Sequence, residues 1–457
     1  MRDPSSSYGL LWMTMDMKYI VEQVLASLTR RIIVLHQPNI VAVTGSVGKT
    51  STRVAIAKVL EGRFRVRSPE ENYNNEIGLP LAVLGEHSPG RSVIGWLRVL
   101  CRAARLAFFR DAQFPNLLVL EYGIDKPGDM AHLCAIARPD IAVFTAVSPV
   151  HAANFGDVET LANEKAELIR RMNPEGVAVF NADDERVMVM RESSLPRRED
   201  GQLTTSCTYG WSTSAGVHAE NESLETREDF SFEAGERFCT TYFDLVTPHG
   251  TIVVDLPNQL GRAPVSAALA AATVASRLHV PLEEIATQIA LIEPPNGRLR
   301  PLPGIKGCLL LDDTYNAAPA SMASAIETLS RFTPVESARR IAVLGRMAEL
   351  GQYSEQEHRL LGLRAAEVAD LLITVGEEPR DIRRGAIEAG MDESHTQHFN
   401  TPEEAGRWLD FHVKKGDIIL VKGSQSARME KVVKDLMAQP QRSAELLVRQ
   451  YGAWIES

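Results

Sequence analysis

The chain contains 457 residues, more than one compact core normally holds, so two or three domains are expected. Hydrophobic residues make up 44% and charged residues 24%, the composition of a folded globular protein rather than a disordered chain. No apolar run approaches the roughly 18 residues of a spanning helix, and the polar start lacks the pattern of a signal peptide. Five scattered cysteines without a CxxC pair argue against a zinc ribbon or a disulfide framework and predict a cytoplasmic location.

The net charge of −10 is unevenly distributed along the chain. Residues 1–112 contain 15 Lys and Arg against 9 Asp and Glu, whereas the remaining residues contain 34 against 50. The acidic body argues against general nucleic-acid binding. The basic first quarter is compatible with binding of phosphate or of an anionic membrane surface.

Alternating strand and helix signals fill the first half of the chain. An apolar run at 40–43 predicts a buried strand, and helical spacing of apolar residues follows at 50–61. Further buried strands are predicted at 117–120, 141–144 and 177–180, with helical segments between them. This alternation is typical of a parallel α/β sheet.

The second half of the chain changes character twice. Residues 190–250 are polar with short alternating runs, which predicts an antiparallel or irregular insertion, and an alanine-rich helix is predicted at 265–278. A Pro-Pro-Asn-Gly hinge candidate at 294–297 separates this part from a second α/β pattern. Its strands are predicted at 308–311, 341–344, 371–375 and 418–421. The predicted fold class is α/β, a central P-loop ATPase-like parallel-sheet domain followed by a Rossmann-like C-terminal domain.

A candidate phosphate-binding loop lies between the first predicted strand and helix. Its glycines let backbone N–H groups turn toward phosphate oxygens, and the helix N-terminus adds its positive dipole end. Lys49 would reach the β- and γ-phosphates, and the Thr50 hydroxyl would bind Mg²⁺. Glu121, directly after the strand at 117–120, supplies an acidic ligand for that metal. The residues expected to hold the nucleotide phosphates are Gly45, Ser46, Val47, Gly48, Lys49, Thr50 and Ser51.

Several further motifs occur in the order of a known family. They are Asn72–Pro80, Glu121–Gly123, Pro127–Asp129, Asp312–Ala317, Leu344–Gly345, Glu349–Gly351 and Val421–Ser424. With the short TGxxGKT[ST] loop, which lacks the first glycine of the longer P-loop pattern, they resemble the Mur ligases, ATP-dependent amide-forming enzymes of peptidoglycan synthesis. The resemblance runs from about residue 38 to about residue 435. It is strongest to the branch that adds D-alanyl-D-alanine to the UDP-MurNAc-tripeptide.

The resemblance implies roles for the residues around the phosphate loop. Lys49 and Thr50 would hold the triphosphate and the first Mg²⁺, and Glu121 would complete that metal site. His151 is similar to the family's second-metal histidine. Lys165 stands where several members carry a carbamylated lysine, which would act as an anionic metal ligand.

The resemblance also implies substrate and nucleotide contacts. Asn74 and Asn75 lie in a loop similar to the family's substrate-side loop. In the C-terminal domain, Arg298 would reach a nucleotide phosphate when the domains close, Asp313 would meet the ribose hydroxyls, and Asn316 would lie near the nucleotide. The positions that would line the site for the incoming amine are Lys422 and Ser424.

The implied reaction has two steps and uses ATP and Mg²⁺. ATP phosphorylates a substrate carboxylate, and an amine then attacks the acyl phosphate to give an amide and phosphate. The expected partners are a small-molecule cell-wall precursor and an amino-acid or dipeptide amine, with no nucleic acid, and the chain is expected to be a monomer. The expected domains are an N-terminal amphipathic segment at 1–37, a central ATP-binding domain at 38–296 and a C-terminal ligase domain at 297–457.

Three features depart from the family pattern. About forty residues precede the loop, fewer than the family's UDP-binding domain needs, so we expect UDP to be held differently, supplied by a partner or replaced by another carboxylate substrate. Ala263 and Ala267 stand where the family has a His and an Asn beside the nucleotide. Arg346 stands where the D-alanyl-D-alanine-adding branch has an acid. These departures affect substrate identity more than reaction type.

Alternatives stay open for the function and for a basic amphipathic helix at 92–109. The chain could be a poly-γ-glutamyl or amino-acid polymer ligase, or a non-catalytic nucleotide-binding partner protein. It could also be similar to the ligase-like subunit that amidates lipid II, against which the missing cysteine cluster argues. The helix at 92–109 would either pack on its own domain or make peripheral contact with an anionic membrane.

Overall fold

The computed structural model describes residues 15–457 apart from 70–72, 149–154, 156, 228, 231, 336, 451–453 and 455–457. The chain forms two compact units. The first consists of residues up to Asn221 together with Phe243–Val254 and Val265–Ile292, and the second of Glu222–Tyr242, Asp255–Pro264 and Glu293–Ser457.

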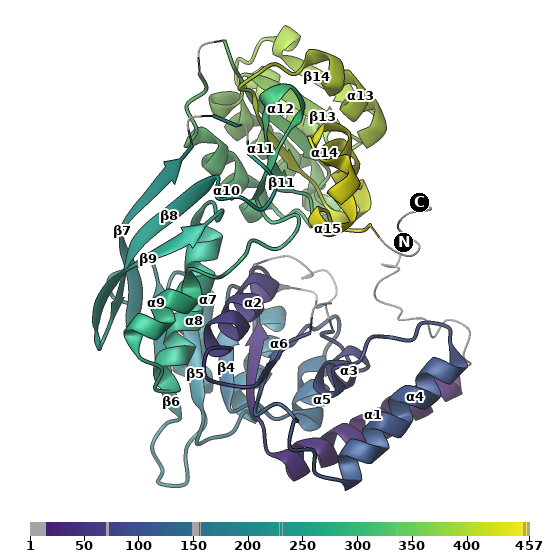
Figure 1. Ribbon diagram of the computed structural model, residues 1–457, viewed down its shortest axis with the longest axis vertical. Coiled ribbons are helices and arrows are strands. Elements are labelled where there is room, and N and C mark those ends of the chain that lie inside the picture. The colour runs from purple at the N-terminus through teal and green to yellow at the C-terminus, as the bar shows by residue number, and fades with distance from the viewer. Residues whose placement is uncertain are drawn as a thin grey trace. The chain divides into compact units, whose positions relative to one another are not determined.

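A nine-stranded sheet carries the phosphate loop (Figure 1). Its strands follow the order β2-β3-β1-β4-β5-β6-β7-β8-β9, and the pairs from β2 to β7 are parallel. The bounds are β1 Asn39–Thr44, β2 Val66–Arg67, β3 Leu117–Glu121, β4 Ile141–Phe144, β5 Val177–Asn181, β6 Thr205–Gly210, β7 Val217–Thr226, β8 Cys239–Thr247 and β9 Gly250–Pro257. The four strands expected in the first half of the chain are thus confirmed.

The expectation for residues 190–250 needs correction in its first part. β6 and the start of β7 extend the parallel sheet, because β6 pairs in parallel with β5 and β7 pairs in parallel with β6. β8 and β9 are neighbours in the sheet and are joined by the two residues between Thr247 and Gly250, a connection short enough only for an antiparallel hairpin. The polar composition misled the prediction because these strands are only half-buried.

Helices cover both faces of the parallel strands, as a buried parallel sheet requires. Alternate residues of β1, β3, β4 and β5, such as Ile40, Leu118 and Phe144, join one core with α1, α3, α4, α5 and α6. The helix bounds are α1 Met15–His36, α2 Lys49–Leu60, α3 Gly78–Leu84, α4 Val93–Phe108, α5 Asp129–Ile136, α6 Val158–Arg171, α7 Glu185–Ser194, α8 Arg262–Arg277 and α9 Leu282–Ile289.

The second unit contains a six-stranded sheet with the order β10-β11-β15-β12-β13-β14. All neighbours are parallel except the edge strand β10, which pairs antiparallel with β11. The strands are β10 Arg300–Pro303, β11 Leu309–Asp313, β12 Arg340–Gly345, β13 Leu371–Val375, β14 Thr396–Phe399 and β15 Ile418–Lys422. The helices are α10 Pro319–Ser330, α11 Ser354–Val368, α12 Arg380–Glu388, α13 Pro402–His412, α14 Glu430–Leu436 and α15 Ser443–Leu446. The predicted Rossmann-like pattern is confirmed.

Helix α1 is part of the first unit's core. Leu25, Ala26 and Ile32 lie on one side of the helix and are at most 1% exposed. α1 packs on α3, α4 and α5, and runs alongside α4 (Figure 1). No helix among the described residues is long and apolar enough to cross a membrane.

We predict that Leu25→Ala destabilises the first unit by about 2–5 kcal/mol, because it removes a fully buried side chain and leaves a cavity. The neighbouring Val24→Ala, at a position 41% exposed, should change the free energy of unfolding by less than about 0.5 kcal/mol. Urea unfolding of both variants measures the difference. Equal unfolding midpoints would show that α1 does not stabilise the unit.

Candidate active site

The phosphate loop begins where β1 ends, and two glycines shape it. Gly45 has a φ of 148°, and a Cβ atom there would lie 2.0 Å from Thr145 Oγ1. Gly48 has a φ of 85° and precedes the first residue of α2. The Thr145 hydroxyl donates a hydrogen bond to the Val47 carbonyl at 2.6 Å and so fixes the loop from β4's side. The loop therefore has the close backbone approach that phosphate binding needs.

Two lysine ammonium groups meet at this loop. Lys49 Nζ donates to the Gly45 carbonyl at 2.9 Å, and Lys165 Nζ of α6 donates to the same carbonyl at 3.1 Å. Burial of Lys165, which is 4% exposed, lowers its pKa to about 7, and the nearby charge of Lys49 adds to this effect. This concentration of positive charge favours a polyanionic ligand.

Two of the four predicted metal ligands, Thr50 and Glu121, lie together. Thr50 Oγ1 is 3.0 Å from Glu121 Oε2, and the Asn74 amide is 3.5 Å from Glu121 Oε1. The strand register explains the position of Glu121, because Glu121 at the end of β3 pairs with Val43, just before the loop. The parallel pairing of β1 and β3 thus places the Glu121 carboxylate next to the start of the phosphate loop.

Arg53 is a site residue that the sequence reasoning missed. It lies one turn after Thr50 on α2, is 2% exposed, and holds its Nε 3.8 Å from Glu121 Oε2. Its guanidinium also donates to Ser68 Oγ and to the Pro69 carbonyl. The i to i+3 spacing from Thr50 was the available signal, because residues three apart share one side of a helix.

A hydroxyl and a carboxylate oxygen at hydrogen-bond distance fit a Mg²⁺ ion, which prefers oxygen ligands and keeps positions for phosphate and water. Within the described residues no group of three or more His, Cys, Asp or Glu side chains forms a metal site by itself. His151, the expected second-metal ligand, lies outside the described residues.

A cavity of about 470 Å³ opens beside the loop. It brings Lys49 and Lys165 together with the expected substrate residues Asn74 and Asn75. Asn75 Oδ1 accepts hydrogen bonds from the N–H groups of Ile77 and Gly78 and so shapes the start of α3. The volume is that of a small-molecule site.

In the second unit, the expected nucleotide and amine residues lie close together, with Asp313, Lys422 and Ser424 buried and Asn316 exposed. Lys422 Nζ lies 2.7 Å from Asp313 Oδ2 and donates to the Asn316 carbonyl at 2.9 Å. Burial lowers the pKa of Lys422, whereas the adjacent Asp313 raises it. The pairing follows from the register, because Asp313 of β11 is opposite Lys422 of β15.

Two more predicted residues flank this cluster. Arg298 stacks its guanidinium over the Tyr315 ring at 4.1 Å, and Leu299 N–H donates to Asp313 at 3.3 Å. Ser424 Oγ accepts from the Ala348 N–H at 2.7 Å and donates to the Ala317 carbonyl at 3.3 Å. The structure therefore brings together the residues predicted for this domain.

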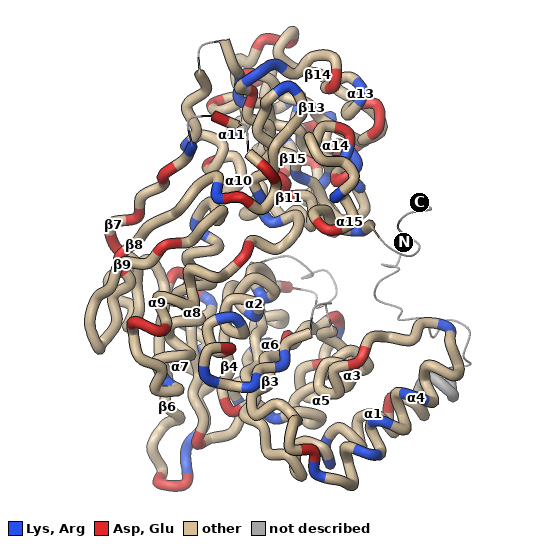
Figure 2. The backbone as a smooth tube through the Cα atoms, viewed as in Figure 1, with Lys and Arg blue, Asp and Glu red and all other residues tan. Residues whose placement is uncertain are grey.

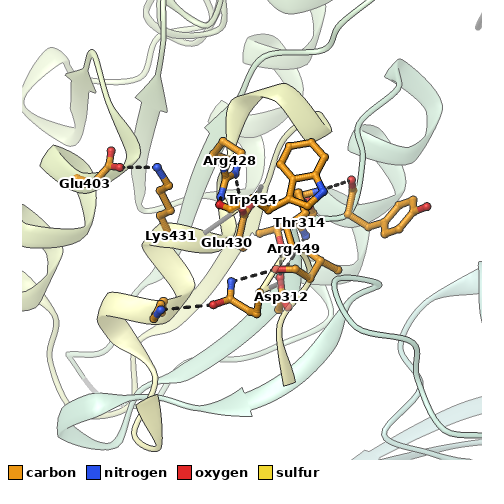
Figure 3. Close-up of polar contacts among 12 residues, drawn as sticks. Asp312, Thr314, Glu403, Arg428, Glu430, Lys431, Arg449 and Trp454 are labelled. Atoms are coloured by element: carbon orange, nitrogen blue, oxygen red, sulfur yellow. Dashed lines mark hydrogen bonds and ion pairs between the residues drawn. The ribbon is translucent and has the colours of Figure 1, made fainter. Parts of the chain in front are cut away.

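A buried ionic network, which sequence reasoning also missed, supports the loop after β11 (Figure 3). Glu430 of α14 is 0% exposed and bonds Arg428 at 2.6 Å and Arg449 at 2.8 Å. Arg449 also donates to the carbonyls of Thr314 and Tyr315. A residue more than a hundred positions away thus holds the loop next to Asp313.

The structure also shows the surroundings of the three residues that depart from the family pattern, Ala263, Ala267 and Arg346. Ala267 is buried in α8, and Ala263 is exposed at the start of that helix. Arg346 forms an ion pair with Glu378 at 3.2 Å. Its backbone carbonyl accepts from the Ser424 N–H at 2.9 Å.

Comparisons with known proteins agree with this arrangement. Residues 104–275 match the Mur ligase middle domain, and residues 297–425 match the Mur ligase glutamate ligase domain. The UDP-N-acetylmuramoyl-tripeptide–D-alanyl-D-alanine ligase of Mycobacterium leprae is 32% identical over 401 residues, which are 85% of this chain and 71% of that protein. The chain belongs to the Mur ligase family. The enzyme of the same name from Bacillus subtilis is 27% identical over 88% of this chain and 76% of its own length.

Solved structures of Mur ligases have a fold similar to that of this chain. MurF from Acinetobacter baumannii has a TM-score of 0.71 at 25% identity and covers 91% of this chain and 80% of its own. MurF from Thermotoga maritima, solved in complex with ADP, has a TM-score of 0.70 at 26% identity, with 91% and 83% covered. The expected family and fold class are therefore confirmed.

Proposed function

We propose that this Mur ligase uses ATP to join the terminal carboxylate of a UDP-muramoyl tripeptide to the amino group of D-alanyl-D-alanine. The observation that carries the proposal is the juxtaposition of Lys49, Thr50 and Glu121 at the loop. The names of the relatives from M. leprae and B. subtilis support the choice of substrates. The second-unit roles of Arg298, Asp313, Asn316, Lys422 and Ser424 toward nucleotide and amine are part of the same proposal.

The residues fit the charge demands of the reaction. A carboxylate oxygen attacks the γ-phosphorus of ATP, the bond to the bridging oxygen breaks, and ADP leaves. The amine then attacks the acyl carbon, loses a proton, and inorganic phosphate departs. Lys49 binds the phosphate oxygens and reduces their repulsion of the carboxylate. Thr50 and Glu121 would hold Mg²⁺, which would neutralise charge on the phosphates.

The test uses purified protein, ATP, Mg²⁺, UDP-muramoyl tripeptide and D-alanyl-D-alanine, with product mass and phosphate release as readouts. We expect the amide product, and a loss of about 100-fold or more with Lys49→Ala, because the phosphate charge loses its partner. Product with glutamate or a polyglutamate chain instead would support the polymer-ligase alternative. Nucleotide binding without turnover on any of these substrates would contradict the proposal and support a non-catalytic protein.

We further propose that Lys165 is carbamylated. The free amine is the form that adds CO₂, forming an N–C bond with loss of a proton. Because burial brings the pKa of Lys165 to about 7, its neutral form dominates at pH 8, unlike that of an exposed lysine. The carbamate would replace a positive charge beside Lys49 with an anionic oxygen ligand for a metal.

The prediction is a carbamate signal in the ¹³C NMR spectrum of protein incubated with ¹³C-bicarbonate. The signal should be strong at pH 8 and decline as the pH falls below about 7, because protonation removes the reactive amine. Lys165→Arg should lack it. A spectrum identical in the wild type and Lys165→Arg would contradict the modification.

Peripheral membrane contact is a separate proposal, carried by the exposed side of α4. Its buried side includes Trp96, Val99 and Leu106, whereas Ile94 is 81% and Leu97 61% exposed. Arg98 and Arg105 are also largely exposed, although each has an acidic neighbour, Glu86 and Asp111. Figure 2 places several basic residues and no acidic one along α4. Exposed apolar and basic groups on one helix match an anionic lipid surface.

We predict that the protein sediments with phosphatidylglycerol vesicles and not with phosphatidylcholine vesicles, and less at high salt. The double variant Ile94→Ser/Leu97→Ser should lose this binding, whereas Val253→Ser, at a position 65% exposed on β9, should retain it. Equal sedimentation of the wild type and the double variant would contradict membrane contact by α4.

A further inference from the structure

Helix α1 forms one wall of the cavity beside the phosphate loop. Tyr19, Glu22 and Gln23 line the cavity that also contains Lys49 and Lys165. Their spacing of three and four residues places them on one side of the helix. The buried side of α1 fixes this wall to the domain through Leu25 and Ile32, each 0% exposed.

The charges of the lining indicate the kind of ligand. Besides the two lysines at the loop, the cavity is lined by Lys126 and by four carboxylates, those of Glu22, Glu76, Asp125 and Asp129. Carboxylates repel a polyphosphate, so this part of the cavity suits a ligand other than the nucleotide. A carboxylate-bearing peptide with a free amino group matches both signs of charge. The cavity volume of about 470 Å³ accommodates a short peptide.

The polar side chains on α1 also suit a peptide. The Gln23 amide is exposed and has both donor and acceptor atoms, which can pair with a peptide N–H and carbonyl. The Glu22 carboxylate accepts from an ammonium group, the stronger kind of hydrogen bond. α1 lies before both matched family domains, which begin at residue 104.

We propose that α1 is the recognition wall for the peptide part of the carboxylate substrate. Gln23 hydrogen-bonds the peptide backbone, and Glu22 binds a free amino group on the peptide. The proposal rests on the ligase function above, and it names the element that selects the carboxylate substrate.

The experiment measures KM for each substrate in the wild type, Gln23→Ala, Glu22→Gln and Ser27→Ala. Ser27 is an exposed residue one turn further along α1 and does not line the cavity, so it serves as the matched control. We expect KM for the tripeptide substrate to rise about 10-fold or more in the two cavity variants, while KM for ATP stays unchanged. Ser27→Ala should behave as the wild type.

A second arm isolates the charge interaction of Glu22. A tripeptide substrate with a free side-chain amino group is compared with the same compound after N-acetylation of that group. Glu22→Gln should raise KM for the free amine and leave KM for the acetylated compound at the wild-type value. An unchanged ratio of the two KM values would overturn the role of Glu22.

The outcomes separate this inference from the proposed function. If the wild type makes no amide, the ligase function fails. If the wild type is active and neither Gln23→Ala nor Glu22→Gln changes KM for the tripeptide, only the role of α1 is overturned. A rise in KM for ATP, or a lowered thermal unfolding temperature equal to that of Leu25→Ala, would assign the effect to folding and also overturn it.

Discussion

The parallel register of β1 and β3 is the constraint on which the first site depends. It pairs Val43 with Glu121, so the phosphate loop that connects β1 to α2 begins beside the Glu121 carboxylate. The Thr50 hydroxyl at the start of α2 then lies 3.0 Å from the Glu121 carboxylate. The glycines of the loop leave backbone space for phosphate, and Lys49 and Lys165, from two different helices, both donate to the Gly45 carbonyl.

In the second unit, too, the register of neighbouring parallel strands places two functional side chains together, here as an ion pair. Neighbouring parallel strands β11 and β15 place Asp313 opposite Lys422, and the buried ion pair holds both side chains in fixed positions. Arg449 supports the loop after β11 through two backbone carbonyls, and Glu430 compensates its charge. Removing one member of such a buried network leaves an unpaired charge, which is why its cost exceeds that of a surface ion pair.

Local sequence patterns predicted most of the parallel strands and the phosphate loop. Uninterrupted apolar runs marked the buried parallel strands, and the glycine spacing marked the phosphate loop. The prediction of an antiparallel or irregular insertion was wrong for β6, which pairs in parallel with β5, because half-buried polar strands carry no continuous apolar run. Arg53 was missed because a buried arginine on an amphipathic helix looks like a solvated one in the sequence.

Contacts between residues far apart in the chain could not be predicted from the sequence. The strand order β11-β15-β12 brings residues over a hundred positions apart into contact, and no local pattern encodes it. For the same reason the Arg449–Glu430 network and the α1 wall of the cavity emerged only from the fold.

We propose that the first site activates a carboxylate by phosphorylation. The most direct test of this proposal is turnover of a tripeptide substrate labelled with ¹⁸O in the terminal carboxylate, followed by mass analysis of the released phosphate. Attack by the carboxylate on ATP predicts that one labelled oxygen appears in each phosphate. Unlabelled phosphate, released together with amide product, would contradict an acyl-phosphate route.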